Sequence, residues 1–279
     1  MKNSIILIYD DACPMCAAYS KLFVRLGLLP TSGRIAYSDS FNQSYSVLID
    51  RDKSVNEIPL IDLEKNQTYY GLDSLLEILS RKYSSFEIIK KIRPLYWILQ
   101  KLYLLISYNR KVIIPPVICD SNSCNPKFNL KYRVLFFLFA MSITALVFYQ
   151  FSQTLLSTNL HSYTGFFGLD ILLLFVPSVM GQIVISFFTQ RQFFWDYIGN
   201  VATFNLEGAG FLLLWSILFN FSSNNIQIVF WGICLSVIIK GILNIKRSTH
   251  LGISIRYASF WSLTFLTSFL LGWLLLYKR

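Results

Sequence analysis

The sequence predicts an α/β domain at the N-terminus, followed by an all-α transmembrane bundle of about five helices. Charged residues are concentrated early: 18 of the 25 Lys and Arg lie at or before Arg133, and 12 of the 15 Asp and Glu lie at or before Asp120. The whole chain is nevertheless 54% hydrophobic with a mean hydropathy of +0.49, which is too apolar for a soluble protein of 279 residues. We therefore expect an α/β domain over residues 1–114, a linker over 115–133 and a membrane domain over 134–279.

The first part alternates short strand-like and helix-like segments. A run of apolar residues at 5–9 predicts a buried strand, and the segment that follows it has the composition of a helix ended by Gly27 and Pro30. The turn at 64–67 separates two β-prone segments and predicts a hairpin. The expected elements are strands over 5–9, 34–38 and 47–50, a helix over 13–28, a hairpin of 58–63 with 68–70, and helices over 71–79 and 94–110.

Five later segments have the length and the apolar composition of membrane-spanning helices, for which about 20 residues suffice. The third contains Glu207 and a Gly208-Ala209-Gly210 break, so a re-entrant segment is an alternative there. The expected spans are 134–156, 165–189, 201–221, 226–245 and 257–277.

Basic residues predict the orientation of these spans. Lys and Arg precede the first span and lie in the loops after the second and the fourth, whereas the loops 157–164 and 222–225 contain none. Cytoplasmic loops are enriched in Lys and Arg, so we expect a cytoplasmic N-terminal domain and an external C-terminus at Arg279. The run 5–9 is too short for the apolar core of a secretory signal and leads directly into Asp10, which favours the same orientation.

The formal net charge of +10 does not indicate a nucleic-acid partner. The chain lacks a basic run with interleaved aromatic residues of the kind that follows a phosphate backbone. Its basic residues lie beside apolar spans, where membrane topology already accounts for them. We expect no nucleic acid among the partners, and membrane lipid instead.

The pair Cys13 and Cys16 carries the most specific chemical signal. A strand, a tight turn and two cysteines one helical turn apart are what thiol–disulfide exchange requires. The first sulfur lies at a helix N-terminus, where the helix dipole stabilises a thiolate, and we expect it to be exposed. Pro14 suits the first helical turn because its missing N–H has no partner there anyway. A zinc site and a purely structural pair are the alternatives.

Cys119 and Cys124 form a second pair in the linker. Together with Cys13 and Cys16 they could complete a four-thiolate zinc site, although their spacing is loose for one. They could also pass electrons between the first pair and the membrane, with a quinone as the acceptor. Incidental reduced thiols in a cytoplasmic linker are the third interpretation.

Three motifs occur in an order that resembles the DCC family of predicted thiol–disulfide oxidoreductases. They are Tyr-Asp-Asp-Ala-Cys-Pro-Met-Cys at 9–16, Tyr-Gly-Leu-Asp-Ser-Leu-Leu at 70–76 and Leu-Tyr-Leu-Leu-Ile-Ser-Tyr-Asn-Arg at 102–110. The resemblance covers roughly residues 4–114 and implies a thioredoxin-like fold and disulfide reductase chemistry. Two positions depart from the family pattern: Asp11 replaces a usual Gly, and Ser107 a usual Ala. A carboxylate beside the thiol disfavours the thiolate.

Other residues of these segments have more than one possible role. Asp10 could cap the turn and the helix, or transfer a proton to the second thiol. Pro59 resembles the cis-proline of thioredoxin-like folds, which lies against the reactive sulfur; an ordinary edge-strand proline is the alternative. We expect Asn109 and Arg110 to pack on the domain or to meet lipid head groups, without a catalytic role.

Within the apolar spans, Glu207 and Lys240 are costly residues at similar expected depth. We expect them to form an ion pair between two helices, with a proton or substrate path as the alternative. Cys234 is expected to serve packing.

The sequence therefore predicts a membrane-anchored protein disulfide reductase. Cys13 would be the nucleophile, Cys16 the resolving thiol, and Asp10 the turn-shaping or proton-handling group. Pro14 and Pro59 would lie beside the substrate, a disulfide-bearing protein or a small thiol. We expect a redox-active disulfide with no bound cofactor and no metal. A quinone-coupled redox carrier, and a non-enzymatic scaffold or transporter, are the alternatives.

Overall fold

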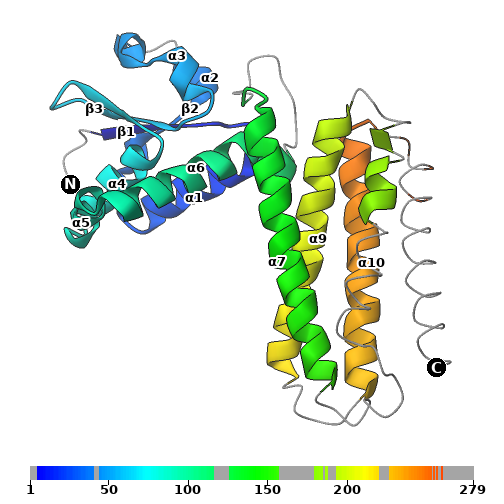
Figure 1. The fold of residues 1–279 in the computed structure, drawn as a ribbon. Helices are drawn as coiled ribbons and strands as arrows, with labels where there is room; N and C mark the ends of the chain where they lie inside the picture. The colour runs from blue at the N-terminus through cyan, green and yellow to red at the C-terminus, as the bar shows by residue number, and fades with distance from the viewer. Residues whose placement is uncertain are drawn as a thin grey trace. The chain divides into compact units, whose positions relative to one another are not determined.

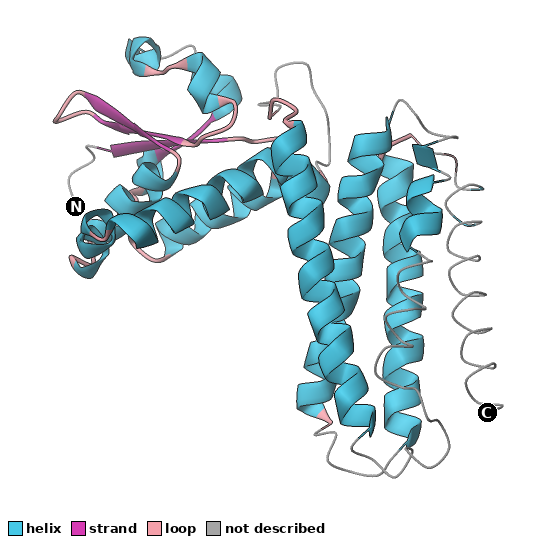
Figure 2. Cartoon of the chain, in the orientation of Figure 1, coloured by secondary structure: helices cyan, strands magenta, loops and turns pink. Residues whose placement is uncertain are grey.

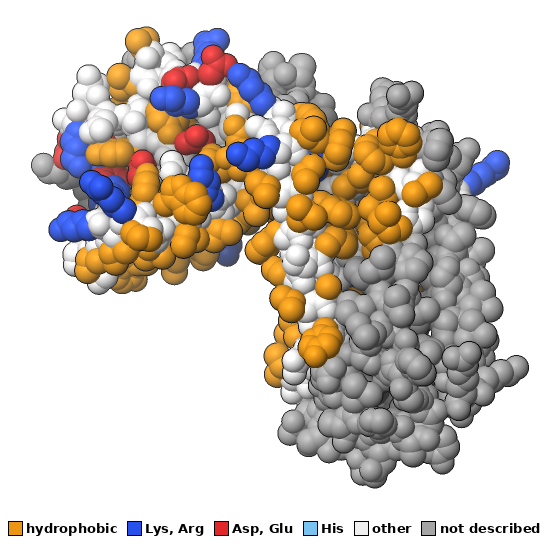
Figure 3. Space-filling model, in the orientation of Figure 1, with side chains coloured by type: hydrophobic (Ala, Val, Ile, Leu, Met, Phe, Trp, Pro, Cys, Tyr) orange, Lys and Arg blue, Asp and Glu red, His pale blue; other side chains and the backbone are white. Residues whose placement is uncertain are grey.

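A computed structural model describes residues 5–40, 44–115, 126–156, 179–184, 186–187, 193–219, 226–252, 254, 256 and 259. The chain divides into two compact units, Met1–Val134 and Leu135–Arg279. In the face drawn in Figure 3, charged side chains gather over the first unit and apolar side chains cover the described helices of the second.

The first unit is built on a small mixed sheet (Figure 1). Its strands are β1 (Ile5–Tyr9), β2 (Arg34–Ala36), β3 (Pro59–Asp62) and β4 (Gln67–Tyr70), in the spatial order β2-β1-β3-β4. β1 runs parallel to β2 and antiparallel to β3, while β3 and β4 form an antiparallel hairpin. A small mixed sheet covered by helices is consistent with the thioredoxin-like fold that the family resemblance implied.

Alternation along β1 divides the core between the two faces of the sheet, because successive side chains of a strand point to opposite faces. Ile5 and Leu7 pack with Leu60 and Ile78 on one face, where residues of the long helices also pack. Ile6 and Ile8 pack with Ile49 and Ile61 on the other. The helices of this unit are α1 (Pro14–Arg25), α2 (Tyr37–Ser40), α3 (Arg51–Ser54), α4 (Leu72–Ser80), α5 (Ser85–Lys91) and α6 (Arg93–Ile113).

The prediction was correct for β1, the hairpin, α4 and α6, and differs from the structure in three places. The segment 47–50 is not a strand: Ser44–Leu48 forms a 3₁₀ helix, and the carboxylate of Asp50 then accepts hydrogen bonds from the N–H groups of Asp52 and Lys53, which starts α3. The helix α5 was not expected. The second strand is shorter than predicted, because α2 begins at Tyr37.

The described helices of the second unit include α9 (Phe194–Leu218) and α10 (Ile226–His250); α7 (Leu130–Leu156) leads into it (Figure 2). In the described part of the chain, two segments are long and apolar enough to cross a membrane: Leu130–Gln150 and Phe194–Leu218. Among the described residues, two of the roughly five expected spans thus meet this criterion.

Two of the expected spans, 165–189 and 257–277, lie largely outside the described residues. The third is an uninterrupted helix, because α9 continues through Gly208 and Gly210; the re-entrant alternative is wrong there.

Helices α9 and α10 are joined by a different ion pair from the expected one. Among the described residues, Glu207 pairs with Arg247, with Oε1 2.5 Å from Nη2. Lys240 instead lies with its Nζ 4.5 Å from the ring centroid of Phe148, and its aliphatic chain fills the space beside Gly208. The absence of a side chain at Gly208 allows this approach, and Arg247 lies two helical turns beyond Lys240, where Glu207 reaches it.

Candidate functional site

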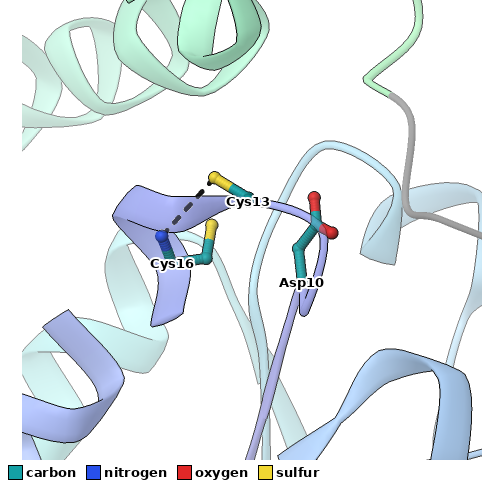
Figure 4. A group of neighbouring side chains, drawn as sticks. All are labelled: Asp10, Cys13 and Cys16. Atoms are coloured by element: carbon teal, nitrogen blue, oxygen red, sulfur yellow. Dashed lines mark hydrogen bonds between the residues drawn. The ribbon is translucent and has the colours of Figure 1, made fainter. Parts of the chain in front are cut away.

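Asp10, Cys13 and Cys16 converge where β1 ends and α1 begins (Figure 4). Their carboxylate and sulfur atoms all lie within 4.8 Å of one another, and all three residues are buried. The N–H of Cys16 donates a hydrogen bond to the sulfur of Cys13 at 3.4 Å. The cysteines therefore have the proximity that an exchange between them requires.

Local sequence produces this turn. Cys13 has extended backbone angles and is the N-cap of α1, and Pro14 occupies the first turn, where no N–H is needed. Asp10 lies before the cap: its backbone carbonyl accepts from the N–H of Cys13 at 3.2 Å, and its Oδ1 accepts from the N–H of Ala12 at 3.2 Å. Asp10 thus shapes the turn, while the capping group of the helix is the Cys13 sulfur.

Arg110 completes the site from 100 residues further along the chain. Its Nη2 lies 2.8 Å from Oδ2 of Asp10 and donates a second bond to the carbonyl of Val55 at 3.2 Å. Both side chains of this ion pair are buried, at 7% and 6% exposure. Arg110 therefore packs on the domain, as expected, and it also pairs with a residue of the candidate site, which was not predicted. The Asn109-Arg110 motif drew attention to this residue, but a local sequence pattern does not show that its partner is Asp10.

The neighbouring Asn109 is also buried, and its Nδ2 donates to the carbonyls of Leu105 and Tyr132. Ser107, which departs from the family pattern, donates its hydroxyl to the carbonyl of Asn56. These bonds fix the last turns of α6 within the first unit and so hold Arg110 in place.

The environment activates one thiol and suppresses the other. The pKa of Cys13 is lowered to about 7, first by the hydrogen bond from the Cys16 thiol, then by the Cys16 N–H and the charge of Arg110, against burial and the charge of Asp10. The pKa of Cys16 is raised by its hydrogen bond to Cys13 and by burial. Cys13 is therefore the group that ionises near neutral pH.

The two carboxylates differ in environment. Burial raises the pKa of Asp10, and the guanidinium of Arg110 opposes this rise. Asp11 is exposed, and its Oδ1 accepts from the N–H of Ser38 at 3.4 Å. The carboxylate that opposes the Cys13 thiolate is thus Asp10, and Arg110 offsets it.

Both cysteines are nearly fully buried. Cys13 is 5% exposed and Cys16 is 6% exposed, whereas exposure of the first cysteine was predicted. The prediction was wrong because the Cys13 side chain turns inward to cap the helix. A cavity of about 290 Å³ adjoins the pair, and its walls include Cys16, Asp10 and Arg110.

Pro59 lies in the wall of the same cavity, at the start of β3. The Ile58–Pro59 peptide is trans, so the cis geometry anticipated from thioredoxin-like folds is not found. The N–H of the neighbouring Ile58 donates to the hydroxyl of the half-buried Tyr103 at 3.0 Å. Tyr19, also half-buried, shares a hydrogen bond with the thiol of Cys16. Neither tyrosine was singled out from the sequence.

The remaining candidates lie elsewhere. Cys119 and Cys124 lie outside the described residues, so neither the second redox pair nor a four-thiolate zinc site is tested. Cys234 is a half-buried free thiol on α10. Among the described residues, the group able to offer three ligand atoms to a metal is Asp10, Cys13 and Cys16, and in it Oδ2 of Asp10 is already bonded to Arg110.

Comparison with known proteins gives one match. Residues 7–114 match the model of a family described as DCC1-like thiol-disulfide oxidoreductase. Neither the curated proteins nor the solved structures include a match. The matched range holds the motif at 9–16 and ends four residues after Arg110, so it contains the whole site described above. The match to the DCC1-like thiol-disulfide oxidoreductase model over residues 7–114 confirms the family resemblance that the sequence motifs indicated.

Proposed function

We propose that this protein is a membrane-anchored disulfide reductase in which Cys13 attacks and Cys16 resolves. The observation that carries the proposal is the asymmetry of the two thiols: one ionises near pH 7 while its neighbour, within 4.8 Å, stays protonated. Thiolate is the nucleophile in disulfide exchange, so this asymmetry assigns the order of attack.

The exchange consists of two displacements. The Cys13 thiolate attacks one sulfur of a substrate disulfide, forms a mixed disulfide and releases the other substrate sulfur as a thiolate. Cys16 then loses its proton and attacks the Cys13 sulfur, which releases the second substrate thiol and leaves a Cys13–Cys16 disulfide. A thiol donor restores the dithiol by the reverse exchange. Electrons move only between sulfur atoms, so the reaction needs no bound cofactor.

Asp10 and Arg110 would tune these steps. The positive charge of Arg110 favours the Cys13 thiolate, which accelerates the first attack. The pKa of Asp10 is raised by burial, which suits a group that accepts the Cys16 proton in the second attack. Its bonds to the N–H of Ala12 and to Arg110 equally support the turn-shaping role.

Membrane anchoring is supported by two long apolar helical segments and by their exposed surfaces. Ile217 and Leu218 of α9 are 73% and 76% exposed, and Leu146 of α7 is 66% exposed. Large apolar side chains in such numbers are expected to face lipid rather than water. The positive-inside distribution supports a cytoplasmic first unit, where disulfide reduction is the natural direction.

A mixed-disulfide trap tests the proposed function. In the full chain, Cys16→Ser removes the resolving thiol, so substrates should remain covalently attached to Cys13 and be released by excess dithiol. Cys13→Ser is the matched control and should retain none. If the two variants capture the same proteins in equal amounts, Cys13 is not the nucleophile and the proposal fails.

A further inference from the structure

The cavity beside Cys16 is lined mostly by apolar and aromatic side chains, and its polar wall residues are Asp10, Ser54, Ser107 and Arg110. Its volume of about 290 Å³ is at the lower end of the range for small-molecule sites. Aromatic and branched aliphatic residues from β1, α1, α4, α6 and the segment before β3 line it, among them Ile8, Phe23, Ile58, Leu75 and Ile106. The cavity lies wholly within the first unit and adjoins the reactive pair.

The charged groups in its wall do not make it an ion site. Asp10 and Arg110 both face the cavity, but they are paired with each other at 2.8 Å, so their charges cancel locally. A charged ligand would have to break this buried pair, which is costly. An apolar ligand leaves it intact and gains from removal of its surface from water.

The cavity also gives access to the buried sulfur atoms of Cys13 and Cys16. Cys13 and Cys16 are nearly fully buried, so the flat surface of a folded partner meets little of either sulfur. Ile106, in contrast, lines the cavity and is 47% exposed, so the cavity wall reaches the molecular surface there. A group that enters past Ile106 meets Cys16, whose sulfur lies within 4.8 Å of that of Cys13.

We propose that this cavity binds an apolar group carried by the substrate, and that the preferred substrates are disulfides with an aromatic or branched aliphatic group next to one sulfur. The apolar group would come from a small disulfide or from a side chain adjoining a peptide disulfide. This inference rests on the proposed exchange. The Cys13 thiolate attacks the sulfur nearest the apolar group and expels the other as a thiolate. Cys16 loses its proton and then displaces the apolar thiol as the Cys13–Cys16 disulfide forms.

The test measures the rate of disulfide reduction by the reduced full chain in detergent. Bis(2-phenylethyl) disulfide is compared with bis(2-hydroxyethyl) disulfide, and each rate constant is divided by that of a free thiol in the same micelles. Two peptides extend the comparison: each carries one cysteine in a disulfide with 2-mercaptoethanol, next to Phe in one and to Ser in the other. We expect an apolar preference of about tenfold, the factor that corresponds to about 1.4 kcal/mol of apolar burial.

Two matched variants locate the preference. Ile106→Trp places a larger side chain at the cavity mouth and should lower the apolar preference at least threefold. Ile98→Trp, on the same helix at 49% exposure and outside the cavity wall, should leave it unchanged. Preference for the apolar member in either pair of probes supports the proposal, and the pair that shows it identifies the source of the group.

Failure of this inference is distinct from failure of the proposed function. If all four disulfides are reduced with equal normalised rates, the exchange stands and the apolar subsite is overturned. A preference that Ile106→Trp and Ile98→Trp lower equally also overturns it. If none of the four is reduced faster than by a free thiol, the proposed function itself fails.

Discussion

Individual residues determine which cysteine reacts. Cys13 caps its own helix, so its sulfur accepts a hydrogen bond from the Cys16 N–H at 3.4 Å. Arg110, which is distant in sequence, pairs with the adjacent Asp10 and adds a positive charge near this sulfur. Cys16 is held protonated by burial and by its neighbour. The same two side-chain types thus acquire opposite properties within one helical turn, because one lies at the helix N-terminus and the other inside it.

Replacing Arg110 tests its contribution to this asymmetry. In Arg110→Gln we expect the pKa of Cys13 to rise by about one unit, because an opposite charge nearby is lost. At pH 7 the alkylation rate of Cys13 should then fall about fivefold, since thiolate drops from about half to about a tenth of the molecules. The rate is measured by mass spectrometry of the full chain. Arg93→Gln, at the exposed start of α6, should leave the rate unchanged.

The same variant also leaves the buried carboxylate of Asp10 without its partner, so we expect it to lower the free energy of unfolding by about 3–5 kcal/mol. Adding Asp10→Asn should recover part of that loss. An Arg110→Gln chain with unchanged Cys13 reactivity would contradict the electrostatic role of Arg110.

The secondary-structure elements that carry the site differ in how well the sequence predicts them. The strand, the turn and the helix around Cys13 are encoded by adjacent residues, so local patterns predicted them. The pairing of Arg110 with Asp10 was not predicted, because the two residues are 100 positions apart and only tertiary packing brings them together. The inward turn of Cys13 was missed because Cys is an uncommon N-cap. In the second unit, Glu207 pairs with Arg247 rather than Lys240. The sequence did not predict this partner, because the position of Glu207 along α10 depends on how α9 packs on α10.

The start of α4 gives a prediction at this scale. Gly71 has φ of +61°, and an added Cβ would lie 2.7 Å from Oε2 of Glu57 and 3.0 Å from the ring of Tyr103. We expect Gly71→Ala to destabilise the hairpin and α4 locally by about 1–3 kcal/mol. Hydrogen exchange of the β3 and β4 amides in the full chain measures this.

Gly27→Ala is the matched control for this prediction. Gly27 has φ of +66° and nothing within 4 Å of an added Cβ, so only the backbone strain applies and the effect should be smaller. Equal protection losses in the two variants would show that the close approach to Tyr103 and Glu57 is unimportant.

At the scale of the whole molecule, a redox domain precedes apolar helices. The charged first unit and the exposed apolar side chains of α7 and α9 suit different surroundings, water and lipid. This division was predicted from composition. Composition is averaged over long segments, so a wrong assignment of a single strand or helix does not change it. Within the described residues, two of the expected spans are long and apolar enough to cross a membrane.

The proposed orientation is tested in intact cells. A protease-cleavable tag at the N-terminus should be protected from external protease, and the same tag after Arg279 should be cleaved, because basic loops are retained on the cytoplasmic side. Permeabilised cells serve as the control, in which both tags are cleaved. Cleavage of the N-terminal tag in intact cells would place the dithiol outside and contradict the reductase direction.

The measurement that tests the central claim most directly is the pH dependence of Cys13 alkylation in the reduced full chain, followed by mass spectrometry. The account predicts a rate that rises with pH with a midpoint of about 7, while Cys16 stays unreactive over the same range. A Cys13 midpoint near 8.5, the value of an unperturbed cysteine, would contradict it.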